Sequence, residues 1–151
     1  MTVATAPRLE LEPFAVGEKP IIYLAGAIDK VPPEFALTWR RQATEALQHK
    51  YKILDPTADK DLYQPGVNTD FYTPEHIVTG DLDKIQIANI ILAEISRTDI
   101  PYHGTSQELV YAYNWQKLIY VWGGCRSYWI RYHATQIFDG LPEAIDHLLY
   151  A

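Results

Sequence analysis

Short apolar runs alternate along this chain with longer segments in which apolar residues recur at helical spacing. The apolar runs predict strands at 20–26, 51–54, 89–95, 118–122 and 134–138. The segments between and after them predict helices at 33–50, 74–88, 104–117, 127–132 and 142–150. Continuous apolar runs of this length are typical of strands buried on both faces of a parallel sheet. The alternation therefore predicts a single-domain α/β fold, a five-stranded parallel sheet with helices on both faces.

Two segments fall outside this periodicity. Residues 1–18 are expected to form a flexible leader, which leaves 19–151 as the domain. Residues 57–72 are polar and contain Pro65 and Gly66, so we expect a long loop that acts as a lid or a mobile segment. Thr73 followed by Pro74 is typical of a helix start, with the threonine as its capping residue.

The composition narrows the class of partner. With 13 Lys and Arg against 19 Asp and Glu, the 151-residue chain has a formal charge of −6. This balance argues against a nucleic acid or an anionic membrane and favours a small polar ligand. The single cysteine, Cys125, permits no internal disulfide, and no apolar run approaches the about 20 residues of a membrane-spanning helix. We therefore expect a cytoplasmic protein.

The segment from Gly104 to Glu108 opens a predicted helix just after the strand at 89–95. In an open α/β sheet, ligands bind beyond the carboxyl ends of the strands, where helices begin. Glu108 is therefore the first candidate for chemistry. An alternative stays open, because Thr105 and Glu108 have the spacing of a capping box, in which both side chains only satisfy backbone N–H groups.

A second acidic candidate comes from the helix predicted at 74–88. At helical spacing Asp81 falls within the apolar stripe of this helix, whereas Asp83 points to the far side. A carboxylate within an apolar stripe must be hydrogen-bonded, paired or protonated, so Asp81 is the better site candidate and Asp83 is expected to be solvated.

The surroundings of Glu108 are also mostly apolar, since Tyr111, Ala112 and Trp115 share its face of the helix. Two carboxylates in different surroundings can divide labour, with one protonated as an acid and the other ionised as a nucleophile. That division is used to cleave a bond at the anomeric carbon of a sugar.

Three motifs in order resemble the nucleoside 2-deoxyribosyltransferases, from about residue 20 to the C-terminus. They are Ile22-Tyr23-Leu24-Ala25-Gly26, then Asp81-Leu82-x-x-Ile85 with Asn89-Ile90-Ile91-Leu92-Ala93, then Gly104-Thr105-x-x-Glu108-x-x-Tyr111-Ala112. The resemblance implies a flavodoxin-like or Rossmann-like sheet. It also implies transfer of 2-deoxyribose between nucleobases without a metal or organic cofactor, with purines the first expectation and acceptance of pyrimidines left open.

By this resemblance Glu108 matches the nucleophile that forms a covalent deoxyribosyl-enzyme, with overall retention. Tyr23 matches the tyrosine that orients it, and Asp81 matches the acid that handles the proton of the base. Gly26 and Gly104 would allow close backbone approach. The expected substrate-binding residues are Gly26, Ala27, Ile28, Asp29, Asp55, Tyr102, His103, Gly104, Thr105, Ser127 and Trp129.

The chain departs from the family pattern at two places. Tyr102 stands where members often carry an Asp, so His103 or Asp99 is a candidate substitute. The first motif continues with Ala27 rather than Pro, and Asp29 nearby either contacts a sugar hydroxyl or caps a turn.

The family also implies a homo-oligomer in which a neighbouring subunit completes the pocket. Eight aromatic residues between Tyr111 and Tyr132 agree with an interface, although core packing or stacking on a base would use the same residues. Ser127, Trp129 and His133 lie in this late region.

Three alternatives to transfer stay open. One is a hydrolase of 2-deoxynucleoside 5′-monophosphates, for which the loop after Gly26 offers Asp29 and Lys30 but no arginine cluster. Another is a nicotinamide-dinucleotide glycohydrolase with a similarly placed glutamate. The third is a nucleotide-binding module without turnover.

Overall fold

A computed structural model describes residues 18–63, 73–125 and 127–150. The predicted leader, apart from residue 18, and residues 64–72 of the predicted long loop lie outside these described residues. The strands are β1 (Ile21–Ala25), β2 (Lys52–Leu54), β3 (Ile90–Glu94), β4 (Leu118–Trp122) and β5 (Gln136–Phe138). The helices are α1 (Pro33–Leu47), α2 (Pro74–Ile87), α3 (His103–Asn114), α4 (Tyr128–His133) and α5 (Leu141–Tyr150).

All five strands run parallel in one sheet, in the order β2-β1-β3-β4-β5. This is the flavodoxin-like order, in which the chain reverses its direction of winding between β1 and β3. The prediction of a five-stranded parallel sheet in one α/β domain is therefore confirmed. The reversal point matters for function, because the loops after β1 and β3 diverge there and leave room for a ligand.

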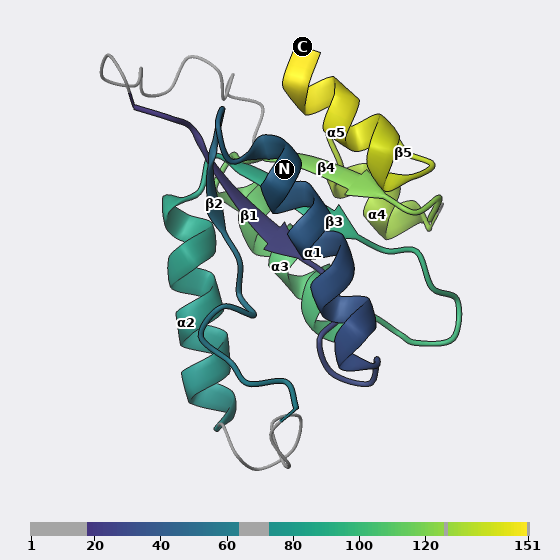
Figure 1. Ribbon diagram of the computed structural model, residues 1–151. Helices are drawn as coiled ribbons and strands as arrows, with labels where there is room; N and C mark the ends of the chain where they lie inside the picture. Colours follow the sequence, from purple (N-terminus) through teal and green to yellow (C-terminus); the bar gives the residue numbers. More distant parts are fainter. Residues whose placement is uncertain (1–17, 64–72, 126, 151) are drawn as a thin grey trace.

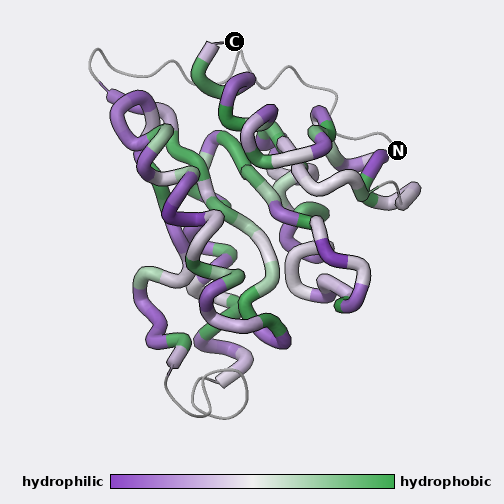
Figure 2. Tube along the Cα trace, turned by 45° about the vertical axis from the view of Figure 1, so that its right-hand side comes forward, coloured by the Kyte–Doolittle hydropathy of each residue, from purple (hydrophilic) through white to green (hydrophobic). Residues whose placement is uncertain are grey.

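The helices cover both faces of the sheet. In Figure 1, α1 lies in front of the strands and α3 behind them. Helices α1 and α5 contact each other on one face, whereas α3 contacts α2 and α4 on the other. The tube in Figure 2 shows hydrophobic residues concentrated along the strands in the middle of the molecule. No helix among the described residues has the length and apolar character needed to cross a membrane.

Strand β1 shows how the two faces are built. Ile22 and Leu24 pack with the core beneath α1 and α5, whereas Tyr23 and Ala25 pack with the core beneath α2 and α3. Successive side chains of a strand point to opposite faces, so every second residue joins the same core. Tyr23 therefore reaches the face that carries α2 and α3.

The start of α2 agrees with the prediction. The Thr73 hydroxyl accepts a hydrogen bond of 3.1 Å from the backbone N–H of His76, and Pro74 occupies the first helical position. This capping satisfies one of the backbone donors that a helix start leaves unpaired.

The start of α3 does not follow the capping-box alternative. The helix begins at His103, and Tyr102 precedes it in the left-handed conformation (φ 53°, ψ 43°) without a side-chain cap. Thr105 is therefore the third residue of the helix rather than its cap, and a capping box needs the threonine at the capping position. That alternative is wrong, and another explanation is needed for Glu108.

Most predicted element ends differ from the structure by one to three residues. The helix predicted to end at 50 ends at Leu47. The helix predicted over 104–117 ends at Asn114, because Gln116 adopts a left-handed φ of 65° that a right-handed helix cannot contain. The fifth strand is also shorter than predicted and begins at Gln136.

Candidate active site

A cavity of about 300 Å³ lies where the loops after β1 and β3 meet the segment after β2 and the helices α2 and α3. Its volume is at the lower end of the range for small-molecule sites. Eleven of the predicted site residues line it: Tyr23, Gly26, Ala27, Ile28, Asp29, Asp81, Tyr102, His103, Gly104, Thr105 and Glu108. Residues from four separate parts of the chain thus meet at the point where the winding of the sheet reverses.

Glu108 receives a hydrogen bond of 2.8 Å from the Tyr23 hydroxyl, which donates to Oε2. Glu108 lies in the second turn of α3, and Tyr23 lies in the middle of β1, where it is paired with both β2 and β3. The tyrosine ring is buried. The carboxylate is therefore held at one oxygen by a group that the sheet fixes in place.

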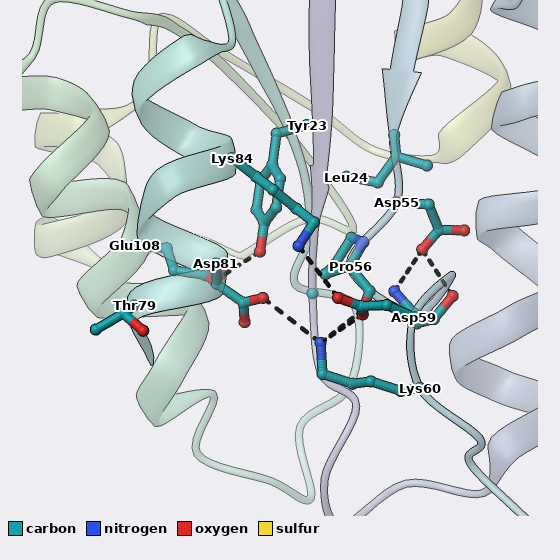
Figure 3. Close-up of polar contacts among 12 residues, drawn as sticks. Tyr23, Leu24, Asp55, Pro56, Asp59, Lys60, Thr79, Asp81, Lys84 and Glu108 are labelled. Atoms are coloured by element: carbon teal, nitrogen blue, oxygen red, sulfur yellow. Dashed lines mark hydrogen bonds and ion pairs between the residues drawn. The ribbon is translucent and has the colours of Figure 1, made fainter. Parts of the chain in front are cut away.

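Asp81 projects from α2 toward the same cavity and is paired with Lys60, whose Nζ lies 3.5 Å from its Oδ1. Figure 3 shows Asp81 beside Glu108, with Lys60 below and Tyr23 above. The Asp81 side chain is only 14% exposed, whereas Asp83 is exposed, as the helical periodicity predicted. The two aspartates therefore lie on different faces of α2, with Asp81 lining the cavity and Asp83 facing water.

Burial and the neighbouring charge of Asp81 raise the pKa of Glu108 to about 7, against the opposing effect of the Tyr23 hydrogen bond. Burial likewise raises the pKa of Asp81, and the ammonium groups of Lys60 and Lys84 oppose this rise. The pKa of Tyr23 lies well above its usual range, because the ring is buried and faces the Glu108 carboxylate. Tyr23 therefore stays a hydroxyl donor, and Glu108 titrates near neutral pH beside a second carboxyl group whose pKa is also raised.

A second glutamate, Glu94 at the end of β3, is fully buried behind the cavity. Its carboxylate accepts hydrogen bonds from Ala27 N (3.3 Å), Ser96 N (2.9 Å) and Ser96 Oγ (2.7 Å), and from the Tyr102 hydroxyl. It thereby ties the loop after β1 to the loop after β3. Burial and the bond to Glu94 raise the pKa of Tyr102 to about 12, so its hydroxyl keeps its proton.

Gly26 fits tightly between this carboxylate and α1. A Cβ at position 26 would lie 3.0 Å from Cζ2 of Trp39 and 3.1 Å from Cβ of Glu94. The close approach predicted for Gly26 is therefore present. Gly104 lines the cavity, and a Cβ there would meet no protein atom within 4 Å, so the close approach expected at Gly104 stays a prediction.

Arg40 supports β1 from the other face of the sheet. Its buried guanidinium group donates to the carbonyl oxygens of Leu24, Gly26 and Ala36 and lies 3.7 Å from Oδ1 of Asp55. Asp55 in turn accepts bonds from the backbone N–H and the hydroxyl of Thr57. The structure therefore places Asp55 in a structural turn beside Arg40, not along the cavity where substrate binding was predicted.

Three other predicted residues also lie away from the cavity. Ser127 caps α4 by accepting a bond from Ile130 N, and Trp129 borders a separate depression between α3 and α4. Asp99, a candidate substitute for the missing aspartate, bonds the Arg97 guanidinium, which lowers its pKa to about 2. Asp99 therefore stays ionised and is not a proton carrier near neutral pH. His103 does line the cavity.

Sequence reasoning missed Lys60 and Arg40. Arg40 carries a signal that was available, since it falls on the buried face of α1 with Ala36, Ala43 and Leu47. Lys60 lies in a polar segment without periodicity. Its position after the end of β2 was the one feature of the sequence that pointed to the site. Within the described ranges, no group of three or more His, Cys, Asp and Glu could hold a metal ion.

No protein-family model and no curated protein matches the sequence. Solved structures do match the fold. A conserved protein of Enterococcus faecalis V583 superposes with a TM-score of 0.69 at 9% identity, over 87% of this chain and 98% of that one. A 2-deoxyribosyltransferase of Bacillus psychrosaccharolyticus gives a TM-score of 0.65 at 19% identity, over 83% and 90% of the two chains. The chain has the fold of the 2-deoxyribosyltransferases.

A related enzyme shares this 2-deoxyribosyltransferase fold. A CMP N-glycosidase of Clostridium botulinum superposes with a TM-score of 0.57 at 20% identity, over 86% of this chain and 99% of that one. Both enzymes are named for chemistry at the bond between a sugar and a base. At these identities the likeness establishes the fold, and the activity of this chain has to be argued from its own site.

Proposed function

We propose that this protein transfers 2-deoxyribose from one nucleobase to another through a covalent ester on Glu108. The observation that carries this proposal is the 2.8 Å hydrogen bond from Tyr23 to Glu108 in a cavity that Asp81 also lines. One carboxylate is oriented for attack, and a second carboxyl group with a raised pKa faces the same space. This pairing is the one needed for substitution at an anomeric carbon with retention.

In the first half-reaction, Oε1 of Glu108 attacks C1′ while Tyr23 holds Oε2. The C1′–N bond breaks, its electron pair goes to the base nitrogen, and the Asp81 carboxyl group gives that base a proton. In the second half-reaction, a nitrogen of the incoming base attacks C1′, the ester bond to Glu108 breaks, and Asp81 takes up the proton of the new base. Two displacements give net retention, and no cofactor enters the balance.

Hydrolysis of a nucleotide is the second candidate, with water in place of the incoming base. The likeness to the CMP N-glycosidase favours it, as does Lys30 at the rim of the cavity, which could meet a 5′-phosphate. The exposed aromatic residues Tyr128, Trp129 and Tyr132 on α4 support the further proposal that the protein self-associates through this surface.

The deciding experiment supplies deoxyadenosine, deoxycytidine or thymidine with and without a second free base, such as adenine, hypoxanthine or cytosine, and separates the products by chromatography. Transfer gives a new deoxynucleoside only when the second base is present. Release of cytosine and the sugar 5-phosphate from deoxycytidine monophosphate or CMP, unaffected by added base, would favour hydrolysis instead. The same assay shows whether purines alone or both base classes are accepted.

The covalent step has its own test, intact-mass spectrometry of samples quenched during turnover. The expected result is an added deoxyribosyl mass that peptide mapping localises to Glu108. Asp81→Asn is expected to slow base exchange while the oligomeric state is unchanged. Turnover by Glu108→Ala at the wild-type rate, or thermal stabilisation by deoxynucleosides with no product formed, would contradict the proposed enzyme.

A further inference from the structure

Lys60 is a nearly buried cation at the edge of the cavity, with 7% of its side chain exposed. It follows β2 and reaches toward α2, where its Nζ lies 3.5 Å from Oδ1 of Asp81. The same ammonium group donates to the carbonyl oxygen of Pro56 at 2.6 Å and lies 3.3 Å from Oδ1 of Asp59. A cation withdrawn from water to this degree is costly unless it is paired, so these contacts fix its position.

Lys60 belongs to a row of alternating charges that links the segment after β2 to α2. In Figure 3 the dashed lines run from Lys84 to Asp59, from Asp59 to Lys60 and from Lys60 to Asp81. Asp59 is 57% exposed and does not line the cavity, whereas Lys60 and Asp81 both do. The row therefore runs from water at one end to the carboxyl groups of the site at the other.

Lys60 is not alone in acting on the Asp81–Glu108 pair. Each charged neighbour affects how readily the pair binds protons. The charged or titratable groups that act on it are Tyr23 from β1, Arg40 from α1, Asp59 and Lys60 from the segment after β2, and Lys84 from α2. Asp29, Lys30 and His103 also line the cavity. Of the cations, Lys60 is the largest influence on Asp81, and it also acts on Glu108.

We propose that Lys60 is a positioning residue of the site, which orients the Asp81 carboxyl group and sets the pH at which the Asp81–Glu108 pair carries a single proton. This inference rests on the proposed function, in which the singly protonated pair reacts through the form that has Glu108 ionised for attack and the proton on Asp81 for the base. The ammonium group acts through Asp81 and does not touch the reacting atoms.

Removal of the Lys60 charge is therefore expected to displace the pH optimum of kcat/KM rather than to lower kcat/KM equally at every pH. Removing a cation beside two carboxyl groups raises both pKa values of the coupled pair, because each ionised form loses a favourable charge interaction. Both limbs of the bell-shaped profile of kcat/KM then move to higher pH. Removing the Asp59 carboxylate has the opposite effect, since its charge raises the pKa of Asp81.

The experiment compares Lys60→Gln, Lys60→Arg and Asp59→Asn with the wild type by the pH profile of kcat/KM. Lys60→Gln is expected to move the optimum upward and to lose on the order of tenfold in kcat/KM on the acidic side, with a smaller loss at its own optimum. Asp59→Asn is expected to move the optimum downward. Lys60→Arg keeps the charge and is expected to restore the wild-type optimum.

A purely structural role for Lys60 gives a different result, in which Lys60→Gln and Asp59→Asn both lower kcat/KM and neither moves the optimum. That outcome would overturn the inference. If Lys60→Gln does not fold, Lys60→Arg and Asp59→Asn still decide the question, because an unchanged optimum in Asp59→Asn contradicts it.

A measurement without substrate separates this inference from the proposed function. Carboxyl-carbon NMR titration of the free protein follows Asp81 and Glu108 directly. Upward displacement of both titrations in Lys60→Gln and downward displacement of the Asp81 titration in Asp59→Asn support the role of Lys60, even if no deoxynucleoside is turned over. Unmoved titrations in a protein that does transfer deoxyribose would reject the role of Lys60 alone.

Discussion

Glu94 and Glu108 are two glutamates at the same end of the sheet, and they differ in how many donors surround them. Four donors from three residues converge on the fully buried Glu94 carboxylate. From the residues that the structure describes, Glu108 receives one bond, from Tyr23, and it faces the cavity. A carboxylate with both oxygens engaged by donors holds loops together, whereas one with an oxygen still available can react. The number of donors thus separates the two roles.

The largest expected effect tests the reactive side of this comparison. Glu108→Gln keeps the shape of the side chain but removes the nucleophile, so kcat is expected to fall about 10⁴-fold, which is about 5.5 kcal/mol of barrier. Single-turnover kinetics measure the loss, and circular dichroism checks the fold. Unchanged turnover in a folded Glu108→Gln protein would remove the distinction between the two glutamates.

Glu94→Ala tests the structural side. The substitution leaves the donors of Ala27, Ser96 and Tyr102 without their acceptor, so the free energy of unfolding is expected to fall by about 3 to 5 kcal/mol. Urea denaturation measures this. Tyr102→Phe, which removes one of the four donors, serves as the graded control and should cost about 1 to 2 kcal/mol. Equal losses for both variants would mean that the carboxylate is not the centre of this network.

The pH dependence of stability gives a third test. The pKa of Glu108 is about 7 in the folded protein against 4.5 without the burial, so the folded state binds the proton more tightly than the unfolded state does. Stability therefore falls as the pH rises from about 4.5 to about 7, by about 3 kcal/mol. Glu108→Gln has no ionisable group at this position, so its stability is expected to rise relative to that of the wild type as the pH increases across that interval. Thermal unfolding at a series of pH values measures the difference, and parallel curves would show that Glu108 is not strained by burial.

The smallest expected effect concerns the single donor to Glu108. Tyr23→Phe removes the hydroxyl and leaves the ring packed in the core, so the loss is expected in kcat, by about 10-fold to 100-fold, with little change in KM. Without this bond the pKa of Glu108 also rises, because the bond favours the ionised form. Steady-state kinetics over a pH range separate the two effects. A loss confined to KM would place Tyr23 in substrate binding rather than in orienting Glu108.

Local pattern was sufficient to predict the order of strands and helices along the chain. The apolar run at β1 and the helical spacing on α2 depend on neighbours within a few residues, and the sequence displays those neighbours directly. The same spacing separated Asp81 from Asp83 correctly. Glu108 was predicted from its position at a helix start after a strand, Tyr23 entered the predicted site through the family resemblance, and the structure brings their side chains together.

Interactions between distant segments were not predictable in this way. Lys60 pairs with Asp81, twenty-one positions further along the chain, and Arg40 donates to carbonyl groups at the end of β1. The hydrophobic periodicity of the sequence does not show contacts of this kind. Asp55 was among the expected substrate-binding residues, yet its carboxylate lies beside Arg40 and accepts hydrogen bonds from Thr57. The helix start at His103 was also missed, because a tyrosine in the left-handed conformation is rare and has no sequence signature.

The left-handed backbone at Tyr102 restricts how this wall of the cavity can evolve. Glycine or asparagine would accept φ 53° with little strain but would lose the hydrogen bond that the Tyr102 hydroxyl donates to Glu94. A β-branched residue would lose this bond and also resist the conformation. Stepwise substitution at position 102 therefore passes through weakened proteins, and we expect changes in what the cavity binds to arise first at other lining residues such as Ile28 or Ile77.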